Sequence, residues 1–219
     1  MAATEQSIGI VGPGVILDGI LRVPERATGL VLFAHGSGSG RLSPRNQFVA
    51  QVLNEAGLAT LLLDLLTSDE ECDSRLVFDL ELLSQRLALA ASWASDDAEL
   101  EDLPMGLFGA STGAAAALIA AARDPGMARA VVSRGGRPDL AGSALSRVAV
   151  PTLLIVGGDD RDVLELNRRA MVRMACHVRL EVVPGATHLF PEPGAMEEVA
   201  AMAREWFVRF LRDPRENGT

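Results

Sequence analysis

Residues 109–113 read Gly-Ala-Ser-Thr-Gly and lie between an apolar run and an alanine-rich segment. Met105 to Phe108 predicts a short buried strand, and the alanine run as far as Arg123 predicts a helix. A serine on a tight strand-to-helix turn projects its hydroxyl from the tip, and the flanking glycines let the strand and the helix approach closely. This context predicts a nucleophilic Ser111, and a glycine-rich turn with an inert serine is the alternative.

Strand and helix patterns alternate along the chain. Strands are expected at Ser7–Val11, Val15–Val23, Gly29–Ala34, Leu58–Leu63, Met105–Phe108, Ala130–Ser133, Pro151–Val156 and Val178–Val183, the first two as an antiparallel edge. Helices are expected from Ser43-Pro44 to Gly57, from Leu76 through Ala91, from the elbow to Arg123, from Val163 to Met174, and over Met196 to Phe210. This alternation predicts an α/β fold whose sheet is mostly parallel, with helices on both faces.

Length and composition limit the possible classes of protein. The 219 residues suit one domain over 1–213, with a frayed polar tail over 214–219. The formal net charge of −9 argues against nucleic acid and anionic membranes as partners. No signal-peptide or membrane-spanning pattern appears, the two cysteines lack metal-binding spacing, and no P-loop pattern is present. We therefore expect a cytoplasmic protein with no metal and no cofactor.

A nucleophilic serine needs a base to take its proton and a carboxylate to orient that base. Of the three histidines, only His188 follows the elbow on a loop after a strand, in Gly-Ala-Thr-His. His177 stands near the start of a strand, at the opposite edge of the sheet, and His35 is expected to pack beneath its own loop. We therefore predict His188 as the base and a structural role for the other two.

The orienting carboxylate is expected in the turn after the Pro151–Val156 strand, where Asp159, Asp160 and Asp162 lie close together. A G-x-x-D-x-x-V arrangement over residues 157–163 selects Asp160. Neighbouring aspartates can exchange this role, so the other two stay open. The turn lacks the glycine and spacing of a calcium-binding loop, which disfavours a metal site.

An attacked carbonyl also needs N–H donors for its developing oxyanion. One is expected from the backbone of Thr112, the residue after the nucleophile. The other is expected from the backbone of Ser37, in the glycine-rich turn after the Gly29–Ala34 strand.

Several arginines fall on the loops of the same edge. Arg41, Arg45 and Arg134 are predicted to bind substrate, as contacts for a carboxylate or a phosphate. The alternative is that these arginines pair with nearby acidic residues: Asp64, Glu70, Glu71 or Asp139.

The elbow, the His35-Gly36 loop and the His188 turn, taken together, resemble an α/β-hydrolase, closest to the small dienelactone-hydrolase-like group. The resemblance covers nearly the whole chain. It implies a sheet of about seven or eight strands and hydrolysis through an acyl-enzyme. Dienelactone hydrolases proper carry a cysteine in the elbow, whereas this chain has Ser111. The expected activity is therefore that of a serine esterase or thioesterase.

Many hydrolases insert a cap domain between the two strands that here end at Ser133 and begin at Pro151. Only residues 134–150 lie between them, so we expect no cap and an open site. The expected reaction is hydrolysis of small carboxylic esters, thioesters or lactones, by a monomer or homodimer. A non-catalytic ligand-binding module on the same fold and an acyltransferase are the alternatives.

Overall fold

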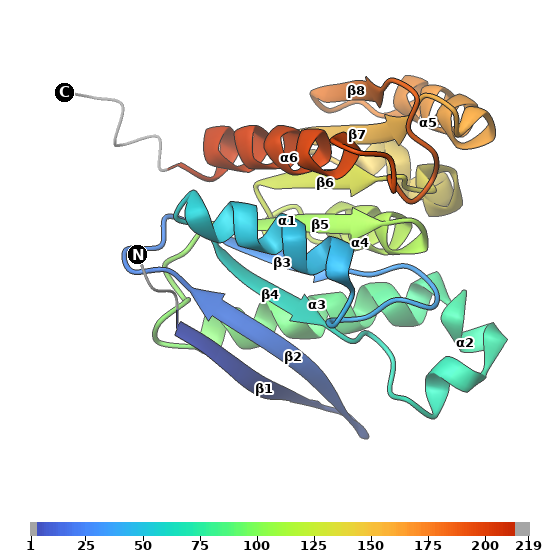
Figure 1. Ribbon diagram of the computed structural model, residues 1–219. Coiled ribbons are helices and arrows are strands. Elements are labelled where there is room, and N and C mark those ends of the chain that lie inside the picture. The colour runs from blue at the N-terminus through green and yellow to red at the C-terminus, as the bar shows by residue number, and fades with distance from the viewer. Residues whose placement is uncertain (1–3, 213–219) are drawn as a thin grey trace.

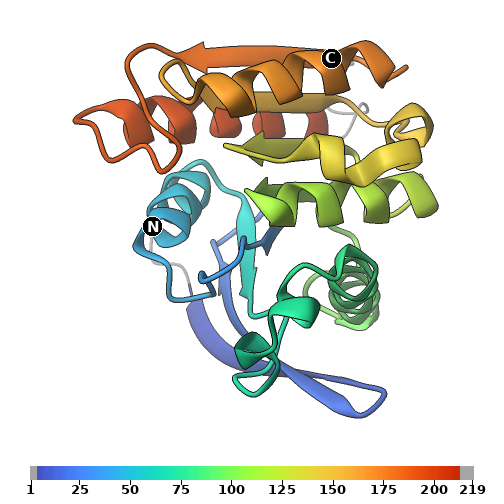
Figure 2. The same cartoon turned by 90° about the vertical axis from the view of Figure 1, so that its right-hand side faces the viewer.

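The computed structural model describes residues 4–212, and its centre is one eight-stranded sheet covered by helices (Figure 1, Figure 2). The strands are β1 Thr4–Gly12, β2 Val15–Val23, β3 Leu30–Ala34, β4 Ala59–Leu63, β5 Met105–Ala110, β6 Ala130–Arg134, β7 Thr152–Gly157 and β8 Val178–Val183. Their order across the sheet is β1-β2-β4-β3-β5-β6-β7-β8. The predicted α/β class and strand number are confirmed, while the predicted tail over 214–219 lies outside the described residues.

The register of the sheet follows the sequence patterns. β1 and β2 form the predicted antiparallel edge, β2 pairs antiparallel with β4, and all later pairings are parallel. Every residue of β3, β4 and β7 is buried, as expected for apolar strands covered on both faces. Parallel pairing brings the carboxyl ends of β3, β5, β6, β7 and β8 to one edge.

Helices cover both faces of this sheet. They are α1 Pro44–Glu55, α2 Ser74–Val77, α3 Leu80–Asp96, α4 Thr112–Arg123, α5 Arg161–Arg173 and α6 Ala195–Leu211, with 3₁₀ segments η1 Glu70–Cys72 and η2 Pro138–Arg147. Figure 1 shows α1 and α6 in front of the sheet and α3 and α4 behind it. The two faces bury separate apolar clusters, because Leu107 of β5 joins the α3–α4 side and Phe108 joins the α1–α6 side.

The prediction of one continuous helix from Leu76 through Ala91 is wrong, because the structure has two helices there. Helix α2 ends at Val77, and α3 starts only at Leu80. Asp79 starts the new helix by accepting a hydrogen bond from the Leu82 N–H at 3.0 Å. Apolar residues keep a helical spacing across the break, so the periodicity hid it.

The start of α1 also differs from expectation. The helix begins at Pro44 as predicted, but Ser43 makes no side-chain capping bond. Its Oγ is buried and has no hydrogen-bond partner. The serine therefore marks the helix start without satisfying the N–H groups there.

The segment between β6 and β7 forms no cap. It contains η2, which packs against α4 and α5 at the side of the sheet (Figure 2). The carboxyl edge of the sheet is thus left uncovered by any inserted domain in residues 4–212. No helix in this range is long and apolar enough to cross a bilayer.

Candidate active site

Ser111 occupies the turn between β5 and α4 in an unusual backbone conformation. Its φ is +51° and its ψ is −121°, a region that costs a non-glycine residue roughly 1–3 kcal/mol. Gly113 makes the turn possible, since a Cβ there would overlap the carbonyl oxygens of Ala34 and His35. The strain and the close approach both project Ser111 from the carboxyl edge of the sheet.

His188 and Asp160 meet beside this turn. The distance from His188 Nδ1 to Asp160 Oδ2 is 2.6 Å, and the Asp160 side chain is 15% exposed against 38% for His188. Asp160 precedes the first residue of α5, while Asp159 and Asp162 are exposed. Of the three aspartates in the turn, the structure brings Asp160 to the imidazole.

Backbone contacts fix the two loops that carry this pair. A Cβ on Gly157 would overlap the Ala186 carbonyl oxygen, and the same oxygen accepts a hydrogen bond from the Asp159 N–H at 3.0 Å. The loop after β7 is therefore fastened directly to the loop after β8. This attachment sets the distance between Asp160 and His188.

The nucleophile and the base share a neighbour in the loop after β6. The Ser111 N–H donates to the Arg134 carbonyl oxygen at 3.2 Å. A Cβ on Gly135 would lie 3.6 Å from His188 Cε1, and Gly135 itself has a φ of +50°. Ser111 and His188 thus both lie against the loop after β6, and Asp160 contacts His188.

The two predicted oxyanion donors also lie together. The Ser37 N–H points at the elbow and donates to Thr112 Oγ1 at 3.3 Å. Thr112 is the first residue of α4, so its N–H has no partner within the helix. A Cβ on Gly36 would lie 2.8 Å from Ser111 Cβ, which places the Ser37 loop directly against the nucleophile.

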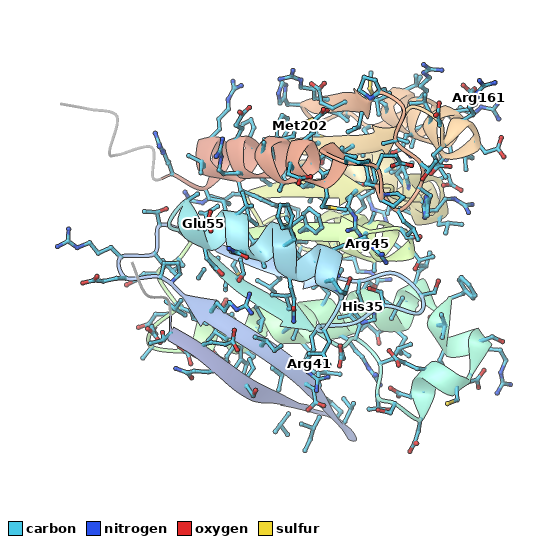
Figure 3. The ribbon with its side chains drawn as sticks, in the orientation of Figure 1. His35, Arg41, Arg45, Glu55, Arg161 and Met202 are labelled. Atoms are coloured by element: carbon cyan, nitrogen blue, oxygen red, sulfur yellow. The ribbon has the colours of Figure 1, made fainter. Side chains whose placement is uncertain are left out.

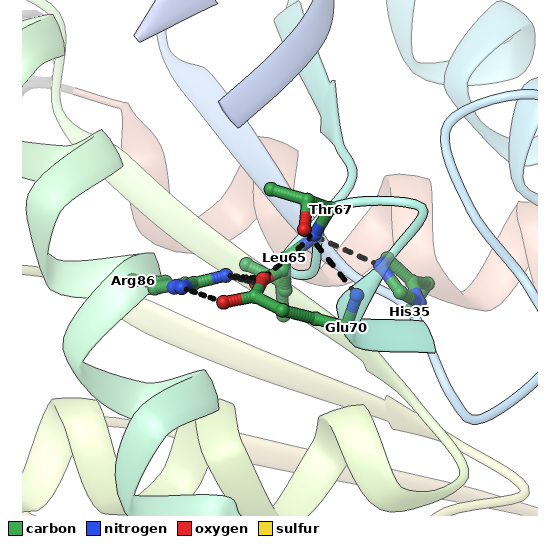
Figure 4. A network of polar contacts seen from close by, with 5 residues as sticks. All are labelled: His35, Leu65, Thr67, Glu70 and Arg86. Atoms are coloured by element: carbon green, nitrogen blue, oxygen red, sulfur yellow. Dashed lines mark hydrogen bonds and ion pairs between the residues drawn. The ribbon is translucent and has the colours of Figure 1, made fainter. Parts of the chain in front are cut away.

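The His35 ring packs against its own loop, as predicted, and joins it to the loop after β4. Its Nδ1 lies 2.9 Å from the Gly36 carbonyl oxygen, and its Nε2 accepts a hydrogen bond from the Leu65 N–H at 2.9 Å (Figure 4). Only the neutral ring with its proton on Nδ1 satisfies both contacts. Burial lowers the pKa of His35, which favours that neutral form.

An ion pair extends the same support. Arg86 Nη1 donates to the Leu65 carbonyl oxygen at 3.0 Å, and Arg86 Nη2 donates to Glu70 at 2.6 Å (Figure 4). The hydrogen bonds from Arg86 lower the pKa of Glu70 to about 2, although burial opposes the shift. These contacts tie the loop after β4 to His35 and to α3, next to the oxyanion donors.

A small pocket of about 130 Å³ adjoins these donors. Ser37 and Thr112 form one wall, and Leu66, Val77 and Leu83 supply an apolar lining. No pattern in the sequence predicted that these apolar residues line a pocket.

The predicted substrate-binding arginines separate into two kinds. Arg41 forms ion pairs with Asp64 and, at 3.4 Å, with Asp18. Arg41 therefore pairs with acidic residues, which was the alternative to substrate binding. Arg45 lies at the start of α1, apart from Arg41 (Figure 3). Neither Arg45 nor Arg134 has an ion pair or a side-chain hydrogen bond within residues 4–212, and Arg134 is only 6% exposed.

His177 lies at the other end of the sheet, just before β8. Its ring stacks on Trp206 of α6 with centroids 5.5 Å apart. The structure therefore places it away from Ser111, in keeping with the expected structural role.

A mostly parallel sheet with a strained serine elbow, and with histidine and aspartate on the loops after its last two strands, defines an α/β-hydrolase. Comparison with known families agrees and is more specific. The profile of the dienelactone hydrolase family matches residues 38–212. The chain belongs to the dienelactone hydrolase family.

Individual relatives cover nearly the whole chain. A crystal structure of a dienelactone hydrolase from Anabaena variabilis is 52% identical, with a TM-score of 0.93 over 96% of this chain and 99% of that one. A serine hydrolase without a lid from Xanthomonas campestris shares the fold at 19% identity, with a TM-score of 0.78 over 95% of this chain and 96% of that one.

A putative phosphoribosyl transferase of Mycobacterium tuberculosis, known from two strains, is 54% identical over 214 residues. The match covers 98% of this chain but 48% of the transferase. The chain thus spans about half the length of these curated relatives.

Proposed function

We propose that this α/β-hydrolase cleaves small carboxylic esters, thioesters or lactones through an acyl-enzyme on Ser111. The observation that carries the proposal is the 2.6 Å contact between His188 Nδ1 and Asp160, made beside a serine at a φ of +51°. Strained backbone of this kind persists where the position of the side chain matters. A carboxylate-oriented imidazole supplies the base that a serine hydroxyl needs.

In the proposed reaction, His188 takes the proton of Ser111 as Oγ attacks the substrate carbonyl carbon. The N–H groups of Ser37 and Thr112 stabilise the oxyanion that forms. Collapse of this intermediate breaks the bond to the alcohol or thiol, which leaves with the proton from His188. Water then attacks the acyl-enzyme with His188 again as base, and the acid is released while Ser111 regains its proton.

We infer that the acyl group is short. The pocket beside the oxyanion donors has a volume of only about 130 Å³, and its lining is partly apolar, with Glu71 among the lining residues. The relative called a putative phosphoribosyl transferase is about twice as long as the segment that it shares with this chain. The groups described above lie within that shared segment, and they suit acyl chemistry.

The test is covalent labelling with a fluorophosphonate probe and turnover of p-nitrophenyl acetate. The wild-type protein should be labelled on Ser111, and Ser111→Ala should abolish labelling and lower turnover by roughly 10³-fold or more. The exposed Ser143 of η2 provides the matched control, because Ser143→Ala should keep both signals. A folded wild-type protein that takes no label, or a Ser111→Ala variant that still turns over, would contradict the proposal.

A further inference from the structure

Two arginines at the carboxyl edge of the sheet have no acidic partner among the described residues. Arg134 ends β6 and is 6% exposed, and its Nη1 is buried without a hydrogen-bond partner. Arg45 lies in the first turn of α1, and its buried Nε also has no partner. Nearby Arg41 and Arg137 differ, since they pair with Asp64 and Asp139.

The two unpaired side chains face the same region. Ala130 and Val132 of β6 pack on the side of the sheet that α1 and α6 cover, and Arg134 points the same way because side chains alternate along a strand. Burial lowers the pKa of Arg134 to about 10, and the charge of Arg45 adds to the shift. The Arg134 guanidinium is therefore still charged at neutral pH.

A buried charge with a second like charge near it is unfavourable unless an anion compensates it. Other unsatisfied donors lie beside them. Ser43 Oγ is buried without a partner, and the N–H groups of Arg45 and Asn46 belong to the first turn of α1, where no helical acceptor exists. A helix start of this kind favours an anion, and Arg134 adds a buried charge on the side of the sheet that α1 covers, near enough to feel the charge of Arg45.

The donor set suits a phosphate better than a carboxylate. A phosphate monoester carries a charge between about −1.5 and −2 and presents three terminal oxygens. Two guanidinium groups and several neutral donors match that charge and that number of oxygens. A carboxylate has one charge and two oxygens, so it would leave one arginine uncompensated.

We propose that Arg45 and Arg134 bind a phosphate group of the substrate, so that the hydrolase acts on phosphate-bearing esters or lactones. This inference rests on the proposed function for its choice of substrate. The Arg134 carbonyl oxygen accepts the Ser111 N–H at 3.2 Å, so the backbone that carries the Arg134 side chain contacts the backbone of the nucleophile. The arginines position the substrate and take no part in bond making.

A matched substrate series tests the specificity. para-Acetoxyphenyl phosphate, para-acetoxybenzoate and para-acetoxybenzamide share one acyl group and differ in the charge of the leaving group. We expect kcat/KM for the phosphate to exceed that for the amide by roughly 10- to 100-fold, with the carboxylate between them. Arg134→Gln and Arg45→Gln should each remove most of this preference, while Arg137→Gln should keep it.

Equal kcat/KM for the phosphate and the amide, or a carboxylate preferred to the phosphate, would overturn the inference. So would an unchanged preference in Arg134→Gln. Arg45→Gln serves as the second variant, because Arg45 is only partly buried and its loss does not remove a core side chain.

Binding can be tested without catalysis. In a Ser111→Ala background, inorganic phosphate at constant ionic strength should raise Tm by about 2 °C or more. The added Arg134→Gln change should abolish this rise, and added Arg137→Gln should not. A rise equal in all backgrounds would overturn the phosphate site. The result is independent of whether Ser111 is a nucleophile, so failure of the site and failure of the proposed hydrolysis can be told apart.

Discussion

Asp160 differs from its neighbours by position rather than by chemistry. Three aspartates share one turn, and only Asp160 is turned inward to His188, at 2.6 Å. Spacing within the turn pointed to the same residue, because the glycine at 157 fixes where the strand stops. Its role as the orienting acid stays a prediction that substitution can test.

Replacing Asp160 by Asn should lower kcat/KM for p-nitrophenyl acetate by roughly 10³- to 10⁴-fold, because the amide no longer holds the imidazole in the tautomer that accepts the serine proton. Asp159→Asn and Asp162→Asn are matched controls from the same turn, and both side chains are exposed. We expect each to stay near wild-type activity. A comparable loss in Asp159→Asn would assign the acid role differently.

Which arginines form ion pairs could not be predicted from their positions in the sequence. Arg41 and Asp64 are 23 residues apart and meet only because the loops after β3 and β4 lie side by side. Arg134 lacks such a partner because of where β6 places it in the sheet. Sequence position alone therefore does not separate the paired arginine from the unpaired ones.

At the scale of elements, apolar patterns located every strand to within a few residues. The elbow was predictable because its turn demands glycine at fixed positions. The break between α2 and α3 was not, since Leu76, Leu80 and Leu83 keep a helical spacing across it. In a sequence, a capping aspartate indicates a helix start less strongly than an apolar stripe indicates a continuous helix. In the structure, however, α3 begins directly after Asp79.

The capping role of Asp79 can be measured. Asp79→Ala removes the acceptor for the Leu82 N–H, so the free energy of unfolding should fall by about 1 kcal/mol in urea titrations. The control is Asp96→Ala at the other end of α3, where an exposed carboxylate faces the negative end of the helix dipole. That change should leave stability unaltered or slightly raised. Equal losses at both ends would show that Asp79 is no cap.

At the scale of the whole molecule, the alternating pattern predicted a parallel sheet and its functional edge. The order of strands brings the loops after β3, β5, β6, β7 and β8 together, although they span residues 35 to 188. Sequence could place each group on a loop but could not measure the contacts between loops. Those contacts depend on backbone fits such as Gly157 against Ala186, which only the folded chain shows.

The neutral state of His35 should make global stability depend on pH. Its pKa in the folded protein lies below the ordinary value of 6.5, so the unfolded chain takes up a proton first as the pH falls. The stabilisation that comes from keeping His35 neutral is fully present above about pH 6.5 and is lost as the pH falls below it. The free energy of unfolding then falls by at most about 1.4 kcal/mol per pH unit.

Urea titrations at pH values from about 7 to 5.5 test this dependence. His35→Gln should flatten the decline in unfolding free energy, while the control His177→Gln should preserve it. If both variants decline as steeply as the wild type, His35 is not the group responsible.

The attachment of the β8 loop has a consequence for synthesis of the protein. His188 follows β8, which pairs only with β7 at the margin of the sheet. Ser111 and His188 are 77 positions apart, so a ribosome makes the elbow well before it makes this histidine. If the proposed mechanism is right, the growing chain carries an inert serine until its last strand docks. Hydrolytic activity would then report completion of the fold more sensitively than secondary structure does.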